Sequence, residues 1–326
     1  MNHPGASPGA GNAAWLSLVA DQEVTPPELL TVEEVVAFRS DPSRDLRRHN
    51  VDLPENVEIR HTVLGEVEGL QTAAEIYVPD GPGPFPMMLY MHGGGWCLGK
   101  AEYVRKLGMS ISARGHVVVN LDYALAPEHP FPAALRQAIF ATRWMVRNAS
   151  EVKGDGGPVA IGGASAGANL AAASIVALAA EDDAEVRFSA ALLLYGVFNF
   201  PLVMEKPGTY AGGFAETVFN LAYLGPHWLT KHRDPLVSPA LAPNLDRFPP
   251  SYLVIGDQDS LLPQSLDMAE RLIGHGVPTT LSVPAGLNHS FAYIPHKLPD
   301  AAAELERMFD WLSARTGAAL RQEVPR

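Results

Sequence analysis

The stretch Ile161-Gly162-Gly163-Ala164-Ser165-Ala166-Gly167-Ala168-Asn169-Leu170 decides the fold of this chain. The apolar run 158–161 before it predicts a short buried strand, and the alanine-rich run 168–180 after it predicts a helix. Between them, residues 163–167 match the pattern G-x-S-x-G, in which a strained, exposed serine occupies a strand-to-helix turn. This flanking context favours a nucleophilic serine over an ordinary small-residue turn.

The composition indicates a globular protein, and the length is enough for one large α/β domain with an appended lid. The chain has 326 residues, of which 47% are hydrophobic and 18% charged, and its formal net charge is −12. The acidic balance argues against a nucleic-acid partner, and no apolar run is long enough for a membrane span. A single cysteine, Cys97, excludes an internal disulfide and a cysteine-based zinc cluster. No signal-peptide pattern opens the sequence, so we expect a cytoplasmic protein.

Strands and helices alternate after about residue 85, which predicts a mostly parallel central sheet with helices on both faces. The expected strands are 57–63, 73–78, 87–91, 116–121, 158–161, 188–194, 251–255 and 279–283. The expected helices are 132–149, 168–180, 263–274 and 300–315. Before them, residues 1–14 predict a tail, and residues 15–49 predict two short helices with Thr31 and Glu34 as a capping box.

Residues 198–235 interrupt this alternation and are rich in aromatic residues and glycine. One interpretation is a surface excursion with its own small core. We favour a lid that lines an acyl or alcohol pocket together with residues 15–50, because long insertions in α/β folds usually lie near the carboxyl ends of the strands, where ligands bind.

A nucleophilic serine needs a base, and the base needs an orienting acid. In a strand-turn-helix site the chain order is serine, then acid, then histidine. His289 follows Ser165 and lies in a glycine-containing loop after the last predicted strand. Structural or solvent roles are favoured for His227, His232 and His275. Asp257 and Asp259 both lie just past strand 251–255, and chain order alone does not separate the acid from a turn-forming aspartate.

The second specific stretch is His92-Gly93-Gly94-Gly95-Trp96, which follows strand 87–91. A tight loop is the alternative interpretation, and glycines alone would be weak evidence against it. Because a nucleophile turn follows about seventy residues later, we favour an oxyanion hole, in which backbone N–H groups point at a developing negative charge and Ala166 adds a further N–H. His92 precedes the serine, so we expect it to brace the loop rather than act as the base.

Three motifs together resemble the bacterial hormone-sensitive-lipase-like carboxylesterases: residues 92–96, residues 163–167, and the stretch YALAPEHPFPA at 123–133. The resemblance covers residues 57–316 approximately and implies an α/β-hydrolase fold with a helical cap. It implies Ser165 as nucleophile, Asp259 as acid, from Asp259-Ser260-Leu261, and His289 as base.

The resemblance also implies an oxyanion hole built from Gly93, Gly94, Gly95 and Ala166, in which Gly93 shapes the loop and the other three donate. It further implies a domain division: an N-terminal tail and cap helices at 1–50, and a catalytic domain at 51–326 with a cap insertion at about 198–235. The chain departs from the family at Ala164, where an acidic residue or threonine is usual, and at Ser290, where glycine is common.

We therefore predict a serine carboxylesterase that hydrolyses small to medium acyl esters. Its expected partner is a small-molecule ester, a homodimer is one option, and no cofactor or metal is expected because no metal-ligand spacing is present. An amidase, a carbamate hydrolase and a deacetylase would use the same residues. A non-catalytic ligand receptor is the alternative from another class, although receptors on this fold normally have a damaged triad.

Overall fold

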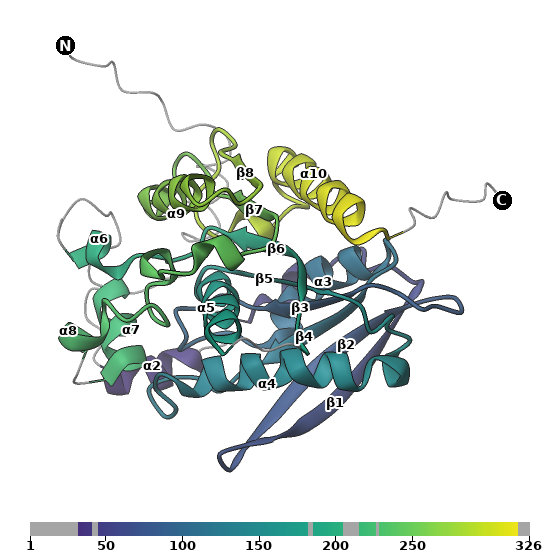
Figure 1. The fold of residues 1–326 in the computed structure, drawn as a ribbon, viewed down its shortest axis with the longest axis horizontal. Helices are drawn as coiled ribbons and strands as arrows, with labels where there is room; N and C mark the ends of the chain where they lie inside the picture. The colour runs from purple at the N-terminus through teal and green to yellow at the C-terminus, as the bar shows by residue number, and fades with distance from the viewer. Residues whose placement is uncertain (1–31, 41–44, 182–184, 205–214, 226–227, 319–326) are drawn as a thin grey trace.

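The computed structural model describes residues 32–40, 45–181, 185–204, 215–225 and 228–318 (Figure 1). Eight strands among them form one sheet in the order β1-β2-β4-β3-β5-β6-β7-β8. The pairs β1–β2 and β2–β4 are antiparallel and the remaining pairs are parallel, which confirms the predicted mostly parallel sheet. The strands are β1 Val57–Val67, β2 Leu70–Pro79, β3 Met87–Met91, β4 Val117–Asp122, β5 Val159–Ala164, β6 Phe188–Leu194, β7 Ser251–Val254 and β8 Thr279–Ser282.

Helices cover both faces of the sheet because its central strands are apolar on both sides, and all five residues of β3 are buried. One face packs against α4 (Ala133–Arg147), α5 (Ala166–Ala180) and α9 (Leu262–Gly274). The other face packs against α3 (Arg105–Ser112) and α10 (Pro299–Thr316). Short 3-10 helices complete the described connections: η3 Leu46–His49, η4 Ala101–Val104, η5 Ala149–Val152, η7 Pro239–Leu241, η8 Leu245–Arg247 and η9 Phe291–Tyr293.

The strand registers bring the loops that matter to one edge of the sheet. Met91 of β3 pairs with Gly163 of β5, and Leu194 of β6 pairs with both Ala164 of β5 and Val254 of β7. Because these strands are parallel, their carboxyl ends lie together and the loops that follow them meet there. This edge is where ligands bind in open α/β sheets.

The N-terminal segment and the 198–235 insertion lie beside each other in the fold. The insertion contains α6 (Phe200–Met204), α7 (Ala215–Leu224) and α8 (Trp228–Lys231), and α2 (Val32–Arg39) contacts α7. Figure 1 shows α2, α6, α7 and α8 gathered at the left of the molecule. The predicted tail at 1–14, the first predicted N-terminal helix and the capping residue Thr31 lie outside the described residues.

The sequence analysis did not predict helix α3. Its first half contains Gly108, a poor helix former, and apolar residues at 107, 109 and 111 alternate as they would in a strand. The structure explains the glycine, because a Cβ atom at Gly108 would lie 2.3 Å from the ring of Tyr77 on β2. Close packing of helix on sheet therefore outweighs the weak local helix preference.

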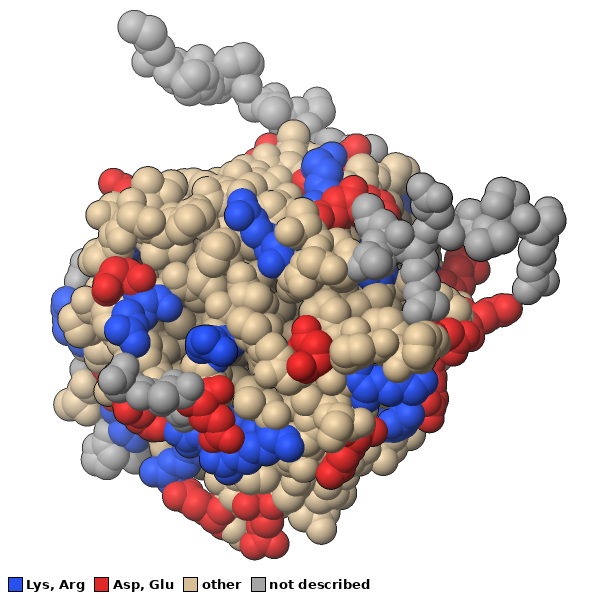
Figure 2. Space-filling view, turned by 45° about the vertical axis from the view of Figure 1, so that its right-hand side comes forward, with Lys and Arg blue, Asp and Glu red and all other residues tan. Residues whose placement is uncertain are grey.

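Charges of both signs are mixed over the surface. Figure 2 shows Lys and Arg side chains next to Asp and Glu side chains across one face. Ion pairs such as Arg60–Glu58, at 2.8 Å, account for part of this mixing. Within the described ranges, no helix has the length and apolar character needed to cross a membrane.

Candidate active site

Ser165 occupies a sharp turn between β5 and α5. Its backbone has φ 54° and ψ −118°, a conformation that is strained for a residue with a side chain. The strain is offset by backbone hydrogen bonds: the Ser165 N–H donates to Leu194 O at 2.8 Å, and the Ser165 carbonyl accepts from the N–H of Ala168 at 3.0 Å. The turn holds the Ser165 side chain at the carboxyl edge of the sheet, at the N-terminus of α5.

Glycines at 163 and 167 are required by close backbone contacts at this turn. A Cβ atom at Gly163 would lie 2.4 Å from the carbonyl carbon of Gly167, and one at Gly167 would lie 2.1 Å from the carbonyl oxygen of Met91. Because these neighbours are backbone atoms, they cannot rotate away. The pattern G-x-S-x-G is thus explained by the packing of α5 against β3 and β5.

The structure brings Ser165, His289 and Asp259 together in one hydrogen-bonded chain. Nε2 of His289 lies 3.0 Å from Ser165 Oγ, and Nδ1 lies 2.7 Å from Asp259 Oδ2. The Asp259 side chain has no exposed surface, whereas the His289 side chain is 29% exposed. Because a carboxylate accepts, Nδ1 carries the proton and Nε2 faces the hydroxyl as an acceptor. This arrangement can remove the Ser165 proton.

Asp257 has a different environment from Asp259. It is exposed, and its Oδ1 accepts the N–H of Gly286 at 2.7 Å, which links the loop after β7 to the loop that carries His289. A second backbone contact joins the same loops, because a Cβ atom at Gly256 would lie 2.0 Å from Leu287 O. Chain order left both Asp257 and Asp259 as candidates for the acid. Of the two, it is Asp259 that contacts His289.

The glycine loop after β3 is held by its carbonyl groups. The Gly93 carbonyl lies 2.8 Å from Nδ1 of His92, and the Gly94 carbonyl accepts the N–H of Cys97 at 3.1 Å and of Leu98 at 2.8 Å. In a trans peptide the C=O and the following N–H point in opposite directions. Anchoring the two carbonyls therefore turns the N–H groups of Gly94 and Gly95 away from those anchors.

These N–H groups are candidates for an oxyanion hole. In the described part of the chain, no hydrogen bond uses the N–H of Gly94, Gly95 or Ala166, and Ala166 begins α5, where N–H groups lack helical partners. Gly93 differs from them because its N–H donates to the Tyr293 hydroxyl at 3.1 Å. That bond occupies the Gly93 N–H, so among the four predicted residues Gly93 is left with a loop-shaping role.

His92 braces the loop from a buried position. Its ring stacks on Tyr123 with centroids 4.2 Å apart, and the Tyr123 hydroxyl donates to the His92 carbonyl at 2.9 Å. Burial lowers the pKa of His92, so the ring is neutral at physiological pH. A neutral ring with its proton on Nδ1 donates to the Gly93 carbonyl.

Aromatic residues of the insertion cover the same loop. Trp96 stacks on Tyr223 of α7 with centroids 4.3 Å apart, and a Cβ atom at Gly95 would lie 2.8 Å from Cγ of Phe219 on the same helix. Arg39, at the end of α2, donates to the carbonyls of Cys97 and Ala126, both at 2.8 Å. The N-terminal helix and the insertion are therefore both attached to the glycine loop or its flanks.

Several residues near the site were missed from the sequence. Tyr195 follows β6 with φ 38°, and its ring packs edge-on against the His289 ring with centroids 5.0 Å apart. Tyr293 and Arg39 make the contacts described above. Their signals are weak in sequence, because a lone tyrosine or arginine outside a motif does not indicate its tertiary neighbour.

The other described histidines that follow Ser165 make their contacts elsewhere. Nδ1 of His275 lies 2.8 Å from Arg271 O at the end of α9, and the His296 ring packs against His49. The His232 carbonyl accepts the Ser238 hydroxyl at 2.6 Å, and His227 lies outside the described residues. No group of three metal-binding side chains occurs in the part of the chain that the structure describes.

Comparisons with known proteins agree on the fold. A family model described as the alpha/beta hydrolase fold matches residues 88–293. The carboxylic ester hydrolase LipN of Mycobacterium tuberculosis is 32% identical over 67% of this chain and 60% of its own length. An arylesterase of Saccharolobus solfataricus is 29% identical over 71% of this chain and 76% of its own. The structure of a hyperthermophilic esterase from Pyrobaculum calidifontis superposes with a TM-score of 0.79 at 25% identity, covering 96% of this chain and 99% of that one.

Proposed function

Because the chain belongs to the alpha/beta hydrolase fold family, we propose that it is a serine carboxylesterase that hydrolyses small to medium acyl esters through an acyl-enzyme on Ser165. The observation that carries this proposal is the continuous chain Ser165–His289–Asp259, with contacts of 3.0 Å and 2.7 Å, beside a loop with unpaired N–H groups. LipN and the arylesterase, both named as ester hydrolases, support the same reaction class.

The proposed mechanism is acyl transfer in two halves. Ser165 Oγ attacks the ester carbonyl while Nε2 of His289 takes its proton, and Asp259 stabilises the imidazolium. The N–H groups of Gly94, Gly95 and Ala166 bind the oxyanion. His289 returns the proton to the departing alkoxide, which leaves as the alcohol. Water then attacks the acyl-enzyme with His289 as base, and the carboxylic acid is released.

A fluorophosphonate probe tests the nucleophile. We expect covalent labelling of the wild-type protein at Ser165 and no labelling of Ser165→Ala. A panel of p-nitrophenyl esters of increasing acyl length, with matched anilides and carbamates, then defines the reaction class. Turnover of anilides or carbamates well above that of esters would replace the esterase proposal with an amidase or carbamate hydrolase. Absence of both labelling and turnover would favour the receptor alternative.

We also propose that the helices of residues 1–50 and of the insertion at about 198–235 form a cap over the catalytic domain. Two contacts support this division: α2 against α7, and the Trp96–Tyr223 stack between the glycine loop and α7. Phe219 lies against Gly95, so it is the cap residue that we expect to limit the substrate most directly. A homodimer and a cytoplasmic location are proposals that light scattering and cell fractionation test.

A further inference from the structure

Tyr293 joins two loops that are far apart in the chain. It ends η9, four residues after His289, and its hydroxyl accepts the N–H of Gly93 at 3.1 Å across 200 positions of sequence. The segment that carries the proposed base is therefore tied directly to the loop that carries the proposed oxyanion donors.

The contact is partly buried and close to the nucleophile. A Cβ atom at Gly93 would lie 3.0 Å from Ala164 O, 3.2 Å from the Tyr293 hydroxyl and 3.3 Å from Ser165 Cβ. Gly93 therefore fits into a narrow space between the nucleophile turn and Tyr293. The space between the nucleophile turn and Tyr293 has no room for a side chain at position 93. The position of the Tyr293 hydroxyl therefore limits how the glycine loop can move.

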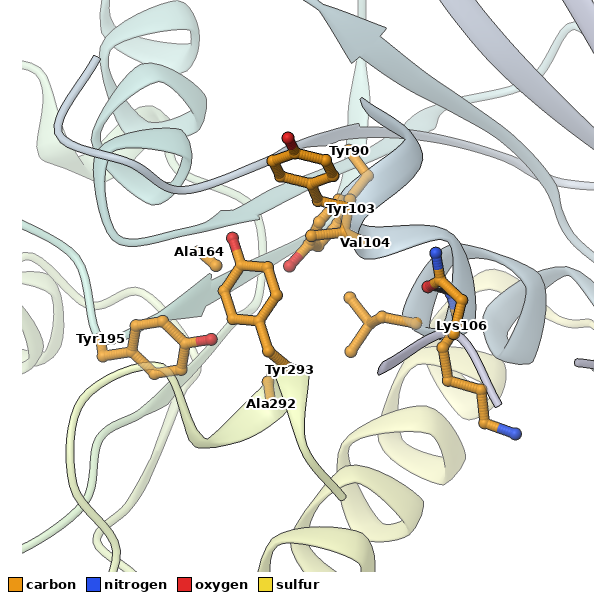
Figure 3. Close-up of a pocket in the computed structure, with 10 residues that line it drawn as sticks. Tyr90, Tyr103, Val104, Lys106, Ala164, Tyr195, Ala292 and Tyr293 are labelled. Carbon is orange, nitrogen blue, oxygen red and sulfur yellow. Dashed lines mark hydrogen bonds between the residues drawn. The ribbon is translucent and has the colours of Figure 1, made fainter. Parts of the chain in front are cut away.

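The Tyr293 hydroxyl stays neutral and borders a small cavity. Burial raises the pKa of Tyr293 to about 12, so the phenol keeps its proton through the range of an esterase assay. A cavity of about 10 Å³ lies beside it, lined by Tyr103, Tyr195 and Ala164 among others. Figure 3 shows Tyr293 between Tyr195, at the lower left, and Tyr103, at the upper right. That volume is enough for about one water molecule, and the oxygen of a water there can accept a hydrogen bond from the Tyr293 hydroxyl.

Two anchors together fix the direction of the Gly94 N–H. The Tyr293 hydroxyl holds the peptide before Gly93 through its N–H, and His92 Nδ1 holds the peptide after Gly93 through its carbonyl. With both neighbouring peptide planes held, Gly93 has little freedom to rotate. Glycine otherwise populates many backbone conformations, so the aim of the next N–H depends on these contacts.

We propose that Tyr293 is a positioning residue of the oxyanion hole, which acts by holding the Gly93 N–H so that the Gly94 N–H points at the developing oxyanion. The proposal rests on the serine esterase function proposed above. The Tyr293 hydroxyl takes no part in the hydrogen bonds among Ser165, His289 and Asp259, so its removal is expected to affect transition-state stabilisation without changing their geometry.

The test is Tyr293→Phe, which removes the hydroxyl and keeps the ring. Tyr103→Phe is the matched control, because it removes another phenol from the same cavity, and no hydrogen bond joins Tyr103 to the glycine loop in the described structure. We expect Tyr293→Phe to lower kcat about tenfold with KM within about twofold, as the loss of one aligned hydrogen bond implies. We expect Tyr103→Phe to keep both constants near wild type.

Three further readouts separate positioning from general destabilisation. Affinity for an alkyl boronic acid, whose adduct places an oxygen in the hole, is expected to fall with kcat in Tyr293→Phe. The midpoint of the pH profile of kcat/KM is expected to stay unchanged, because the His289–Asp259 contact is intact. Hydrogen exchange of a peptide covering residues 92–98 is expected to accelerate in Tyr293→Phe only.

The outcomes distinguish this inference from the proposed function. A wild-type protein without esterase activity, in which Tyr293→Phe still speeds exchange of residues 92–98, overturns the proposed function and leaves the positioning contact supported. An active wild type whose Tyr293→Phe variant keeps kcat and boronic-acid affinity overturns the inference alone. A shifted pH midpoint, or an equal loss in Tyr103→Phe, also overturns it.

Discussion

Replacing Asp259 by asparagine tests how His289 is oriented in the proposed triad. Asp259 uses both carboxylate oxygens: Oδ2 lies 2.7 Å from His289 Nδ1, and Oδ1 accepts the N–H of Leu261 at 2.8 Å. The side chain has no exposed surface, so no alternative hydrogen bond to bulk water is open to an amide at this position. If the amide oxygen keeps the Leu261 N–H, the NH₂ group must face Nδ1.

An NH₂ group opposite Nδ1 selects the wrong tautomer of His289. The imidazole would then carry its proton on Nε2, which lies 3.0 Å from Ser165 Oγ and could no longer accept the serine proton. The same substitution in a serine-protease triad lowers kcat about ten-thousandfold, or about 5.5 kcal/mol in activation free energy. We expect a loss of this order for Asp259→Asn, with the fold intact.

Asp257→Asn is the matched control, two residues away. Asp257 is exposed, and the oxygen of an asparagine can still accept the Gly286 N–H that Asp257 Oδ1 accepts at 2.7 Å. We expect kcat within about twofold of wild type, because the hydrogen bond that Asp257 makes is retained and Asp257 does not contact His289. The free energy of unfolding should change by less than about 1 kcal/mol. The assay compares kcat on a short-chain p-nitrophenyl ester for both variants after circular dichroism verifies folding. Loss of activity in Asp257→Asn, or its retention in Asp259→Asn, refutes this reasoning.

Four further outcomes are expected. Ser165→Ala should remove turnover by on the order of a millionfold while thermal unfolding stays near wild type; residual esterase activity near wild type rules out the acyl-enzyme. Phe219→Ala should move the preferred acyl length upward, gradually, because each methylene contributes about 1–3 kcal/mol; an unchanged ester profile removes Phe219 from the pocket. Ser290→Gly should raise the free energy of unfolding in urea by up to about 1 kcal/mol, because Ser290 has φ 63°; no gain shows that the left-handed conformation is unstrained. Burial lowers the pKa of His116 to about 4 in the folded protein, so as the pH falls the unfolded chain takes up a proton at this histidine before the folded protein does. The free energy of unfolding should therefore fall by up to about 3 kcal/mol between pH 6.5 and pH 4 because of His116. An equal pH dependence in His116→Gln contradicts this.

The parts of the fold that were predictable are those whose cause is local. The strands at 87–91 and 188–194 coincide with β3 and β6, because continuous apolar runs bounded by turn residues are typical of buried parallel strands. The helix predicted at 168–180 begins two residues earlier, at Ala166, since the turn at Ser165 leads straight into α5. Short motifs carry their own structural context, so the serine turn and the glycine loop could be located from sequence.

The residues proposed for the triad were located from the sequence in a different way. Chain order narrowed the base to a loop after the last strand and the acid to two aspartates, and only the family resemblance favoured Asp259 over Asp257. In the structure, Asp257 accepts the Gly286 N–H and Asp259 contacts His289. Composition and periodicity cannot separate two aspartates on one short loop. The aspartates differ in their tertiary contacts, because only one of them faces His289, about 30 residues later in the chain.

Long-range contacts made by residues outside the motifs had no signal in the sequence. Arg39 donates to the carbonyls of Cys97 and Ala126 and pairs with Glu128 at 3.0 Å, which ties α2 to the glycine loop and to the 123–133 motif. Nothing in the pattern around residue 39 distinguishes this arginine from one on a solvated helix face. Two of its partners are backbone carbonyls, which any residue type supplies.

The glycine loop shows most clearly where a motif stops being informative. Three glycines establish that the backbone can approach a ligand closely, but they leave the direction of each N–H undetermined. That direction is set by the partners of the preceding carbonyls: Nδ1 of His92, and the N–H groups of Cys97 and Leu98. All three of these partners lie in the same loop, close to the glycines in the sequence. The Tyr293 hydroxyl, which holds the Gly93 N–H, comes from the loop of the proposed base. The motif thus supplies the proposed donors, and we infer that a tertiary contact outside the motif completes their alignment.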